Sequence, residues 1–250
     1  DSTTPGIECI DVSDAVDPRS AAQARILTTL GEPFDVEHGP LFRVLWIRLA
    51  PGEHVLAFSL HHLVADGASL SIIARDLSEL YSAIRARRRP TLPALEYTYR
   101  DWSRLQRDLS GSSELVKQMD YWRGELAGIP AESTLPFDHP RPVAPTYRGG
   151  DVEFDLPPHI TKGLREIAHD SRCSLFPVLI AAFGALISRC SGQDTAIVGI
   201  PVDDRGSEFK DLVGFFVRSV ALKVDVVGDP SFRDLVARTW DHQRRALANQ

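Results

Sequence analysis

The stretch His61-His62-Leu63-Val64-Ala65-Asp66-Gly67 (HHLVADG) lies where an apolar strand pattern ends and a helical pattern begins. Residues 54–62 (HVLAFSLHH) alternate in the manner of a β-strand, and from Ala68 to about Arg87 the apolar residues recur at helical spacing. Polar side chains at such a junction stand on a rigid support, which suits them to chemistry. The sequence therefore predicts a strand-to-helix junction that carries a functional site.

The two histidines of this junction are expected to differ in role. Successive side chains of a strand point to opposite faces, so only one of His61 and His62 faces a substrate while the other is buried and hydrogen-bonded. Adjacent strand histidines chelate a metal poorly, and a third ligand is missing. A structural pair of buried histidines is a second interpretation. Catalysis by one imidazole is favoured, because Asp66 can fix the turn through an ion pair and Gly67 permits close approach to a ligand.

Composition and charge exclude several classes of function. Lys and Arg number 28 against 34 Asp and Glu, which gives a net charge of −6 and no basic excess for binding nucleic acid. The basic run Arg85 and Arg87–Arg89 ends a predicted helix and complements its dipole, with a docking patch for an acidic partner as the alternative. No apolar run approaches the roughly 20 residues that span a bilayer. The three cysteines form no CxxC pair, which predicts reduced thiols in a cytoplasmic protein.

The rest of the chain combines helical and strand patterns in two halves. The patterns predict helices over 18–30, 68–87, 99–109, 112–126, 158–170, 175–190 and 231–249, and strands over 41–49, 54–62, 151–156, 195–202 and 215–226. Five prolines between residues 128 and 150 predict a crossing between lobes. The expected fold class is α/β (an α+β sandwich) with residues 1–127 in a first lobe and 151–250 in a second.

The whole chain resembles the condensation domains of nonribosomal peptide synthetases. HHLVADG matches their HHxxxDG motif, which chloramphenicol acetyltransferase and other acyltransferases of the superfamily share. No Ser lies in a G-x-S-x-G elbow, which favours direct transfer over a covalent acyl-enzyme. Further similarity, running from about residue 25 to the C-terminus, is carried by Pro33-Phe34-Asp35 with Gly39-Pro40-Leu41, by Tyr99–Trp102 (YRDW), by Tyr121-Trp122, by 191–194 (SGQD) with 198–202 (VGIPV), and by 213–217 (VGFFV).

The sequence departs from the family pattern at several positions. Arg218-Ser219 stands where the family has the Asn-Thr of its FVNT motif, and Lys223 stands where it has Arg. Leu105 and Ala68 replace tryptophans of two other motifs. The early motifs SxAQxRLW and RHExLRTxF have no counterpart, and the HQDxPFE motif would begin near Gln250. The chain is therefore expected to be the middle of such a domain.

The resemblance implies a chloramphenicol-acetyltransferase-like fold of two lobes, each partly covered, with HHxxxDG in the first. It implies that His62 is catalytic, either deprotonating the acceptor amine or positioning it, while His61 is structural. Asp66 would hold the loop by an ion pair, and Gly67 would line the substrate tunnel. Arg205 is a possible partner for an acidic group, although an exposed loop arginine is the favoured interpretation.

The implied reaction joins a carrier-tethered acyl or peptidyl donor to an aminoacyl acceptor through an amide bond, in antibiotic or other secondary-metabolite biosynthesis. No metal and no cofactor bound by the chain are expected; phosphopantetheine would belong to upstream and downstream peptidyl carrier domains, with an adenylation domain adjacent. Neither nucleic acid nor membrane is an expected partner. The alternatives are an ester-forming acyltransferase, an epimerisation domain and a non-catalytic carrier-docking fragment. The isolated 250 residues are expected to be inactive and to aggregate.

Overall fold

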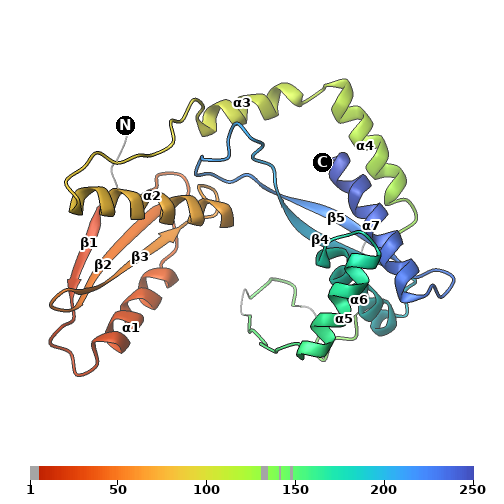
Figure 1. Cartoon of the computed structure of the whole chain (residues 1–250), viewed down its shortest axis with the longest axis horizontal. Helices are drawn as coiled ribbons and strands as arrows, with labels where there is room; N and C mark the ends of the chain where they lie inside the picture. The colour runs from red at the N-terminus through yellow and green to blue at the C-terminus, as the bar shows by residue number, and fades with distance from the viewer. Residues whose placement is uncertain (1–5, 131–134, 141, 147–148) are drawn as a thin grey trace. The chain divides into compact units, whose positions relative to one another are not determined.

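A computed structural model describes residues 6–130, 135–140, 142–146 and 149–250 (Figure 1). Their contacts divide the chain into two compact units. The first unit comprises Asp1–Leu105 together with Asp203–Val217, and the second comprises Gln106–Val202 together with Arg218–Gln250. Each unit thus consists of two separate segments of the sequence.

The first unit contains a three-stranded sheet in the order β1-β2-β3. The strands β2 (Phe42–Ala50) and β3 (Glu53–Leu60) form the predicted antiparallel hairpin, and Gly52 supplies the positive φ of +81° that its turn requires. The strand β1 (Ile7–Asp11) pairs with β2 in parallel, so that Ile7 lies opposite Val44. This strand was not predicted, since it is only five residues long and largely exposed.

The helix α1 (Pro18–Gly31) packs against the sheet of the first unit. It begins at Pro18 because the Asp17 carboxylate caps it, accepting hydrogen bonds from the Arg19 and Ser20 N–H groups, and because proline fits the first helical position. Its apolar side joins the inward side chains of β2 in a core that consists of Ala22, Leu45, Ile47 and Leu49.

Residues 203–217 run from the last residue of β4 (Thr195–Asp203) to the first residue of β5 (Val217–Asp225), and they form part of the first unit. This segment, hereafter the 203–217 loop, buries Phe209, Leu212 and Phe216 in an aromatic cluster. Tyr99 and Trp102 of α3 (Tyr99–Leu109) pack against the cluster. The predicted strand 215–226 accordingly begins only at Val217, because the two residues before it belong to the loop.

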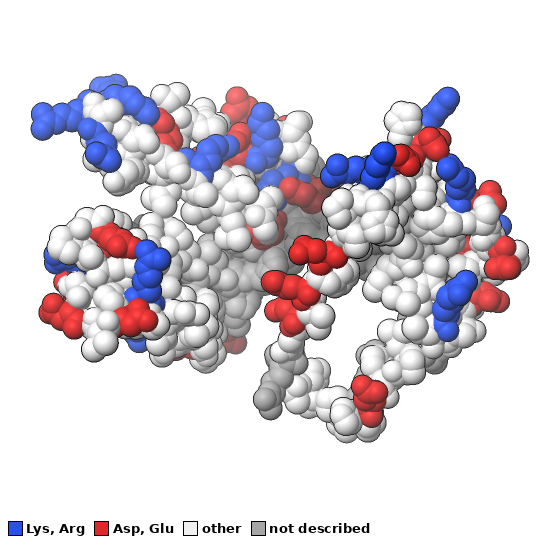
Figure 2. Space-filling model, turned by 60° about the horizontal axis from the view of Figure 1, so that its bottom comes forward, with Lys and Arg blue, Asp and Glu red and all other residues white. Residues whose placement is uncertain are grey.

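The basic run lies at the C-terminal end of α2 (Gly67–Arg85). Arg88 forms a bidentate ion pair with Glu79, with N–O distances of 2.5 and 2.7 Å. The Arg85 guanidinium lies over the Tyr81 ring. Basic charge in and after the last turn of a helix complements its dipole. Figure 2 shows basic and acidic side chains interspersed on the face in view, in keeping with the balanced composition.

In its described residues, the second unit combines the helices α4 to α7 and the end of α3 with a two-stranded sheet of β4 and β5. Its elements are α4 (Ser113–Glu125), α5 (Pro158–Asp170), α6 (Leu175–Ser191), β4 (Thr195–Asp203), β5 (Val217–Asp225) and α7 (Phe232–Ala248). Val178, Ala181, Val224 and Val236 are buried in its core. At Gly184 of α6 the approach is so close that an added Cβ would lie 2.5 Å from Val224 Cβ, so only glycine fits.

The helices predicted from periodicity are present with shifts of one or two residues at their ends, but one predicted strand is wrong. Residues 151–156 form no strand and are exposed, because the alternation of Val152, Phe154 and Leu156 finds no neighbouring strand among the described residues. The predicted crossing at 128–150 lies partly outside the described residues. The division into lobes at 1–127 and 151–250 stays a prediction. The boundaries between the two compact units lie elsewhere, after residues 105, 202 and 217.

Among the described helices, no single one has the length and apolarity to cross a membrane. Only α5 and α6 taken as a pair, bent by 111° between them, meet that test of length and composition. All three cysteines, Cys9, Cys173 and Cys190, are free thiols.

Candidate functional site

The junction between β3 and α2 is built by local hydrogen bonds. β3 ends at Leu60, but the His61 N–H still donates to the Leu41 carbonyl at 2.9 Å, which extends the ladder by one residue. The helix α2 begins after Asp66, whose carboxylate accepts from the Ser69 N–H at 3.0 Å while Ser69 Oγ accepts from the Asp66 N–H at 3.3 Å. This reciprocal capping box fixes the start of α2.

His61 is half-buried and engaged by its own unit. Its Nδ1 accepts a hydrogen bond of 3.1 Å from the Leu63 N–H, and its ring lies edge-on to Phe34 at 5.8 Å between centroids. Because Nδ1 is an acceptor, the neutral ring carries its proton on Nε2.

His62 lies in the turn that follows β3, and it is exposed. Within the described part of the chain no side-chain or backbone group hydrogen-bonds to its imidazole. The ring instead makes an edge-to-face contact with Phe215, 5.1 Å between centroids at an interplanar angle of 69°. The structure thus places one histidine in internal contacts and leaves the other accessible.

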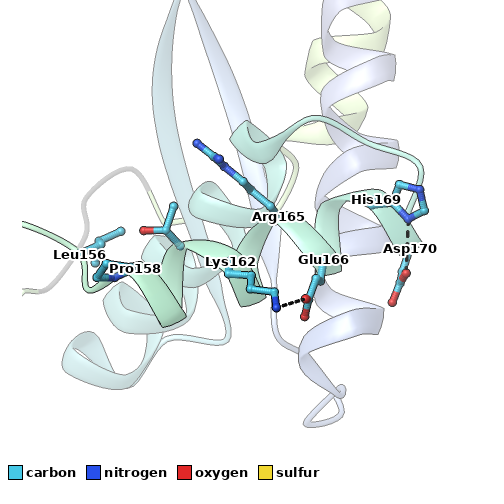
Figure 3. A pocket seen from close by; sticks show the side chains of 8 residues that line it. Leu156, Pro158, Lys162, Arg165, Glu166, His169 and Asp170 are labelled. Atoms are coloured by element: carbon cyan, nitrogen blue, oxygen red, sulfur yellow. Dashed lines mark ion pairs between the residues drawn. The ribbon is translucent and has the colours of Figure 1, made fainter.

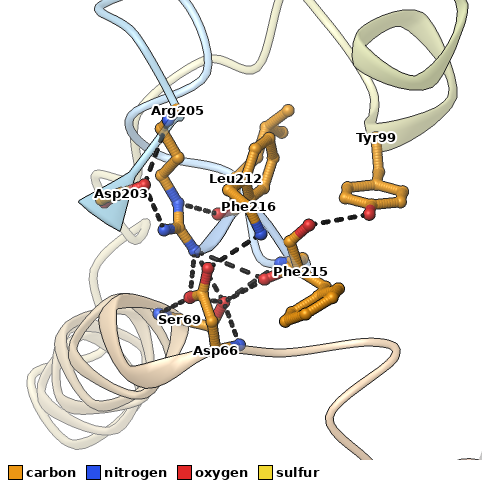
Figure 4. A network of polar contacts seen from close by, with 9 residues as sticks. Asp66, Ser69, Tyr99, Asp203, Arg205, Leu212, Phe215 and Phe216 are labelled. Carbon is orange, nitrogen blue, oxygen red and sulfur yellow. Dashed lines mark hydrogen bonds and ion pairs between the residues drawn. The ribbon is translucent and has the colours of Figure 1, made fainter. Parts of the chain in front are cut away.

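Asp66 forms a buried ion pair with Arg205 of the 203–217 loop (Figure 4). Arg205 Nη2 lies 2.5 Å from Asp66 Oδ1, and the two side chains are 5% and 3% exposed. The expectation that Arg205 is an exposed loop arginine is therefore wrong. The physical reason is that its partner lies 139 residues earlier in the chain, where no local pattern links the two.

Every charged group of this pair has further partners. Arg205 also donates to Asp203 at 2.9 Å and to the Leu212 carbonyl at 3.2 Å, and its guanidinium lies over the Phe216 ring at 4.5 Å. Asp66 Oδ2 accepts from the Phe216 N–H at 3.0 Å. Burial alone would raise the pKa of the Asp66 carboxyl, but the hydrogen bonds from Arg205, Phe216 and Ser69 hold that pKa well below its usual range.

Three residues of this network, Ser69, Gly214 and Tyr99, were not predicted as site residues. Ser69 is fully buried, and its hydroxyl accepts from the Gly214 N–H at 3.1 Å. A Cβ on Gly214 would lie 2.4 Å from Tyr99 Cδ2, so glycine is required there. The Tyr99 hydroxyl donates to the Phe215 carbonyl at 2.9 Å. Only the D-x-x-S spacing of a capping box could have indicated Ser69 from the sequence.

Gly67 is exposed as the first residue of α2, and an added Cβ would meet nothing within 4 Å. Close approach of a ligand to Gly67 therefore stays a prediction. Among the described residues, no group of three or more His, Cys, Asp or Glu side chains could hold a metal ion.

A separate surface hollow of about 680 Å³ runs along α5 in the second unit (Figure 3). Four of its lining side chains form the exposed pairs Lys162–Glu166 at 3.8 Å and His169–Asp170 at 3.6 Å, and Arg165 lines it as well. Exposed ion pairs of this kind contribute little to the stability of the fold. The hollow contains none of the predicted site residues.

Comparison with known proteins identifies the same family that the HHLVADG motif indicates. The family model described as "Condensation domain" matches residues 2–250. The chain belongs to the condensation domain family. It is 40% identical over 224 residues to phosphinothricin tripeptide synthetase PhsB of Streptomyces viridochromogenes. The aligned region covers 88% of this chain and 19% of that protein.

Solved condensation-type domains share the fold. The first condensation domain of the calcium-dependent antibiotic synthetase, in complex with a substrate analogue, is 25% identical with a TM-score of 0.75, over 99% of this chain and 57% of that one. The X-domain from teicoplanin biosynthesis, in complex with OxyB, is 28% identical with a TM-score of 0.84, over 98% of this chain and 54% of that one. The predicted fold class is confirmed, and the chain spans little more than half the length of these solved domains.

Proposed function

We propose that this condensation domain forms amide bonds between substrates held as thioesters on the phosphopantetheine arms of peptidyl carrier domains. The observation that carries the proposal is the exposed His62 imidazole, which makes no hydrogen bond to any described residue and lies at a junction fixed by a buried network. Membership of the family supports the reaction class. The flanking carrier domains, an adjacent adenylation domain and a cytoplasmic setting belong to the proposal.

In the proposed step, the acceptor amine attacks the carbonyl carbon of the donor thioester. A C–N bond forms, the C–S bond breaks, and the pantetheine thiol leaves with the proton that the amine loses. His62 either takes that proton as a general base or positions the amine by a hydrogen bond. His61, Asp66 and Gly67 support it: the first two hold the junction, and Gly67 lines the substrate path.

The test uses the full-length protein with both carrier domains loaded. His62→Ala is expected to lower dipeptide formation by about 10²–10⁴-fold, the usual contribution of a general acid or base. The matched control is His38→Ala, because His38 is an exposed histidine of the same unit whose ring pairs with the nearby Asp35. Undiminished condensation by His62→Ala contradicts the catalytic role.

Two further variants refine the proposal. His62→Gln can hold an amine by a hydrogen bond but cannot take up a proton, so residual activity in this variant identifies positioning as the dominant role. Alcohol and amine acceptors offered side by side separate amide formation from the alternative of ester formation, and the stereochemistry of the recovered donor tests the alternative of epimerisation.

A binding domain without catalytic activity is a second candidate, and the X-domain observation favours it specifically. That domain, similar in fold, was solved in complex with OxyB. Under this alternative the full-length protein retains its output when His62 is replaced. The isolated 250 residues are proposed to be inactive under either function, and their exposed apolar side chains, such as Ile84 and Phe183, to promote aggregation.

A further inference from the structure

The peptide group between Phe215 and Phe216 is held at both ends (Figure 4). Its carbonyl accepts the 2.9 Å hydrogen bond from the Tyr99 hydroxyl, and its N–H donates the 3.0 Å hydrogen bond to Asp66 Oδ2. Because a peptide group is planar, two hydrogen bonds at opposite ends fix the orientation of its plane. They thereby restrict the position of the Phe215 Cα, from which its side chain extends.

The two phenylalanines on either side of this peptide have different environments. Phe216 is fully buried, with ring centroids 5.2 Å from Tyr99 and 5.0 Å from Trp102. Phe215 is half-buried, and its ring meets the His62 ring edge-to-face at 5.1 Å. Phe216 therefore anchors the segment, while Phe215 is directed at the exposed histidine.

The contact with Phe215 restricts the orientation of His62. The imidazole has no hydrogen-bond partner among the described residues, and the ring contact with Phe215 favours the His62 rotamer that makes it. An edge-to-face pair biases such a choice by about two- to tenfold. A catalytic group that drifts from the reacting atoms by an ångström loses much of its effect.

We propose that Phe215 is a positioning residue for His62, and that Tyr99 and Asp66 act on His62 through it. The inference rests on the proposed function of His62 in condensation. Phe215 itself contributes no proton and no hydrogen bond; it holds the imidazole at the angle from which it meets the amine. The sequence signal is the aromatic residue between Gly214 and Phe216 in the VGFFV segment.

The test compares Phe215→Leu with Phe215→Tyr in the full-length protein. Phe215→Leu is expected to lower the kcat of condensation by about tenfold with little change in the KM of the acceptor, and Phe215→Tyr, which keeps the ring, to restore most of it. Tyr99→Phe removes the hydrogen bond but keeps the ring packing, so a smaller loss in the same direction is expected. The matched control is Phe58→Leu, because Phe58 is a half-buried ring of the same unit that stacks on Phe42.

A second readout does not depend on activity. Carbethoxylation of His62 by diethyl pyrocarbonate, followed by peptide mass spectrometry, is expected to accelerate in Phe215→Leu and to stay unchanged in Phe58→Leu. Unchanged His62 reactivity in Phe215→Leu overturns the positioning role. If His62 reacts faster in Phe215→Leu but His62→Ala still forms the full amount of product, Phe215 positions His62 and the proposed catalytic function of His62 is wrong.

Discussion

The guanidinium of Arg205 and the carboxylate of Asp66 lie 2.5 Å apart and are almost completely shielded from water. Arg205 thereby joins the 203–217 loop to the residue that caps α2. An intact buried pair of this kind contributes modestly to the stability of the fold, but removal of one partner leaves an uncompensated buried charge. The pair therefore makes the geometry of the loop depend on the start of α2.

Replacement of Arg205 by methionine is expected to release the 203–217 loop. Breaking a buried pair costs about 3–5 kcal/mol, so the amide of Phe216, which donates to Asp66, should lose more than about a hundredfold of its protection from hydrogen exchange. Hydrogen exchange read by mass spectrometry over 203–217 provides the measurement.

The control for this variant is Arg75→Met. Arg75 pairs with Asp211 of the same loop at 2.5 Å, but its side chain is 44% exposed, so only a few-fold change in protection is expected. Equal loss of protection in the two variants would show that burial does not distinguish the pairs.

The pH dependence of stability is expected to report the Asp66 carboxyl. Its pKa is lower in the folded protein than its ordinary value of 3.8, so the unfolded state binds more protons at low pH. The stabilisation is complete above about pH 5 and is lost as the pH falls below about 4 towards the folded-state pKa.

The measurement is urea unfolding between about pH 2 and about pH 7, a range that begins below and ends above the ordinary carboxyl pKa. Unfolding is followed by tryptophan fluorescence, to which Trp102 beside Phe216 contributes. Other carboxylates contribute, so the informative quantity is the difference between wild type and Asp66→Asn. That difference should shrink as the solution is acidified. A difference that is constant across the whole range would refute the assignment to Asp66.

Addition of one methyl group at position 214 is expected to destabilise the loop. The Cβ of Gly214→Ala would lie 2.4 Å from Tyr99 Cδ2 and 2.7 Å from Phe216 Cε2, and such overpacking costs about 1–3 kcal/mol. Gly163→Ala is the matched control, because nothing lies within 4 Å of its added Cβ and alanine favours a helix by about 0.5–1 kcal/mol. Exchange protection should fall over 203–217 in the first variant and rise over α5 in the second.

The contact at His61 predicts which substitution there is tolerated. His61→Asn retains an acceptor that can receive the Leu63 N–H, whereas His61→Leu leaves that donor without its partner. Condensation should therefore survive largely in His61→Asn and fall in His61→Leu. If both variants lost activity to the same extent as His62→Ala, His61 would have to act directly on the substrate.

Local patterns in the sequence were sufficient to predict most of the fold. The helical periodicity of α1, α2 and α6 placed them within two residues, and Pro51-Gly52 placed the hairpin. The five-residue strand β1 is too short for a pattern, and it exists through its parallel pairing with β2. Residues 151–156 show the converse: they alternate like a strand, but a strand needs a pairing partner, and none lies beside them in the part of the chain that the structure describes.

The site was predictable only as far as its local motif extends. HHLVADG indicated His61, His62, Asp66 and Gly67, yet the fate of Arg205 depended on a contact across 139 residues. Ser69 and Gly214 likewise meet in a hydrogen bond of their own, from 145 residues apart. Burial of a charged side chain is set by the tertiary fold, and a window of neighbouring residues does not contain it.

The composition of the first unit from two distant segments has a consequence for recombination. A chimaera with one crossover anywhere between residues 106 and 202 takes Asp66 from one parent and Arg205 from the other. Such a hybrid depends on both parents having compatible ion-pair partners and a glycine where Gly214 stands. Exchange of residues 106–202 alone, with a crossover at each end, keeps the caps, the loop and the histidines from a single parent.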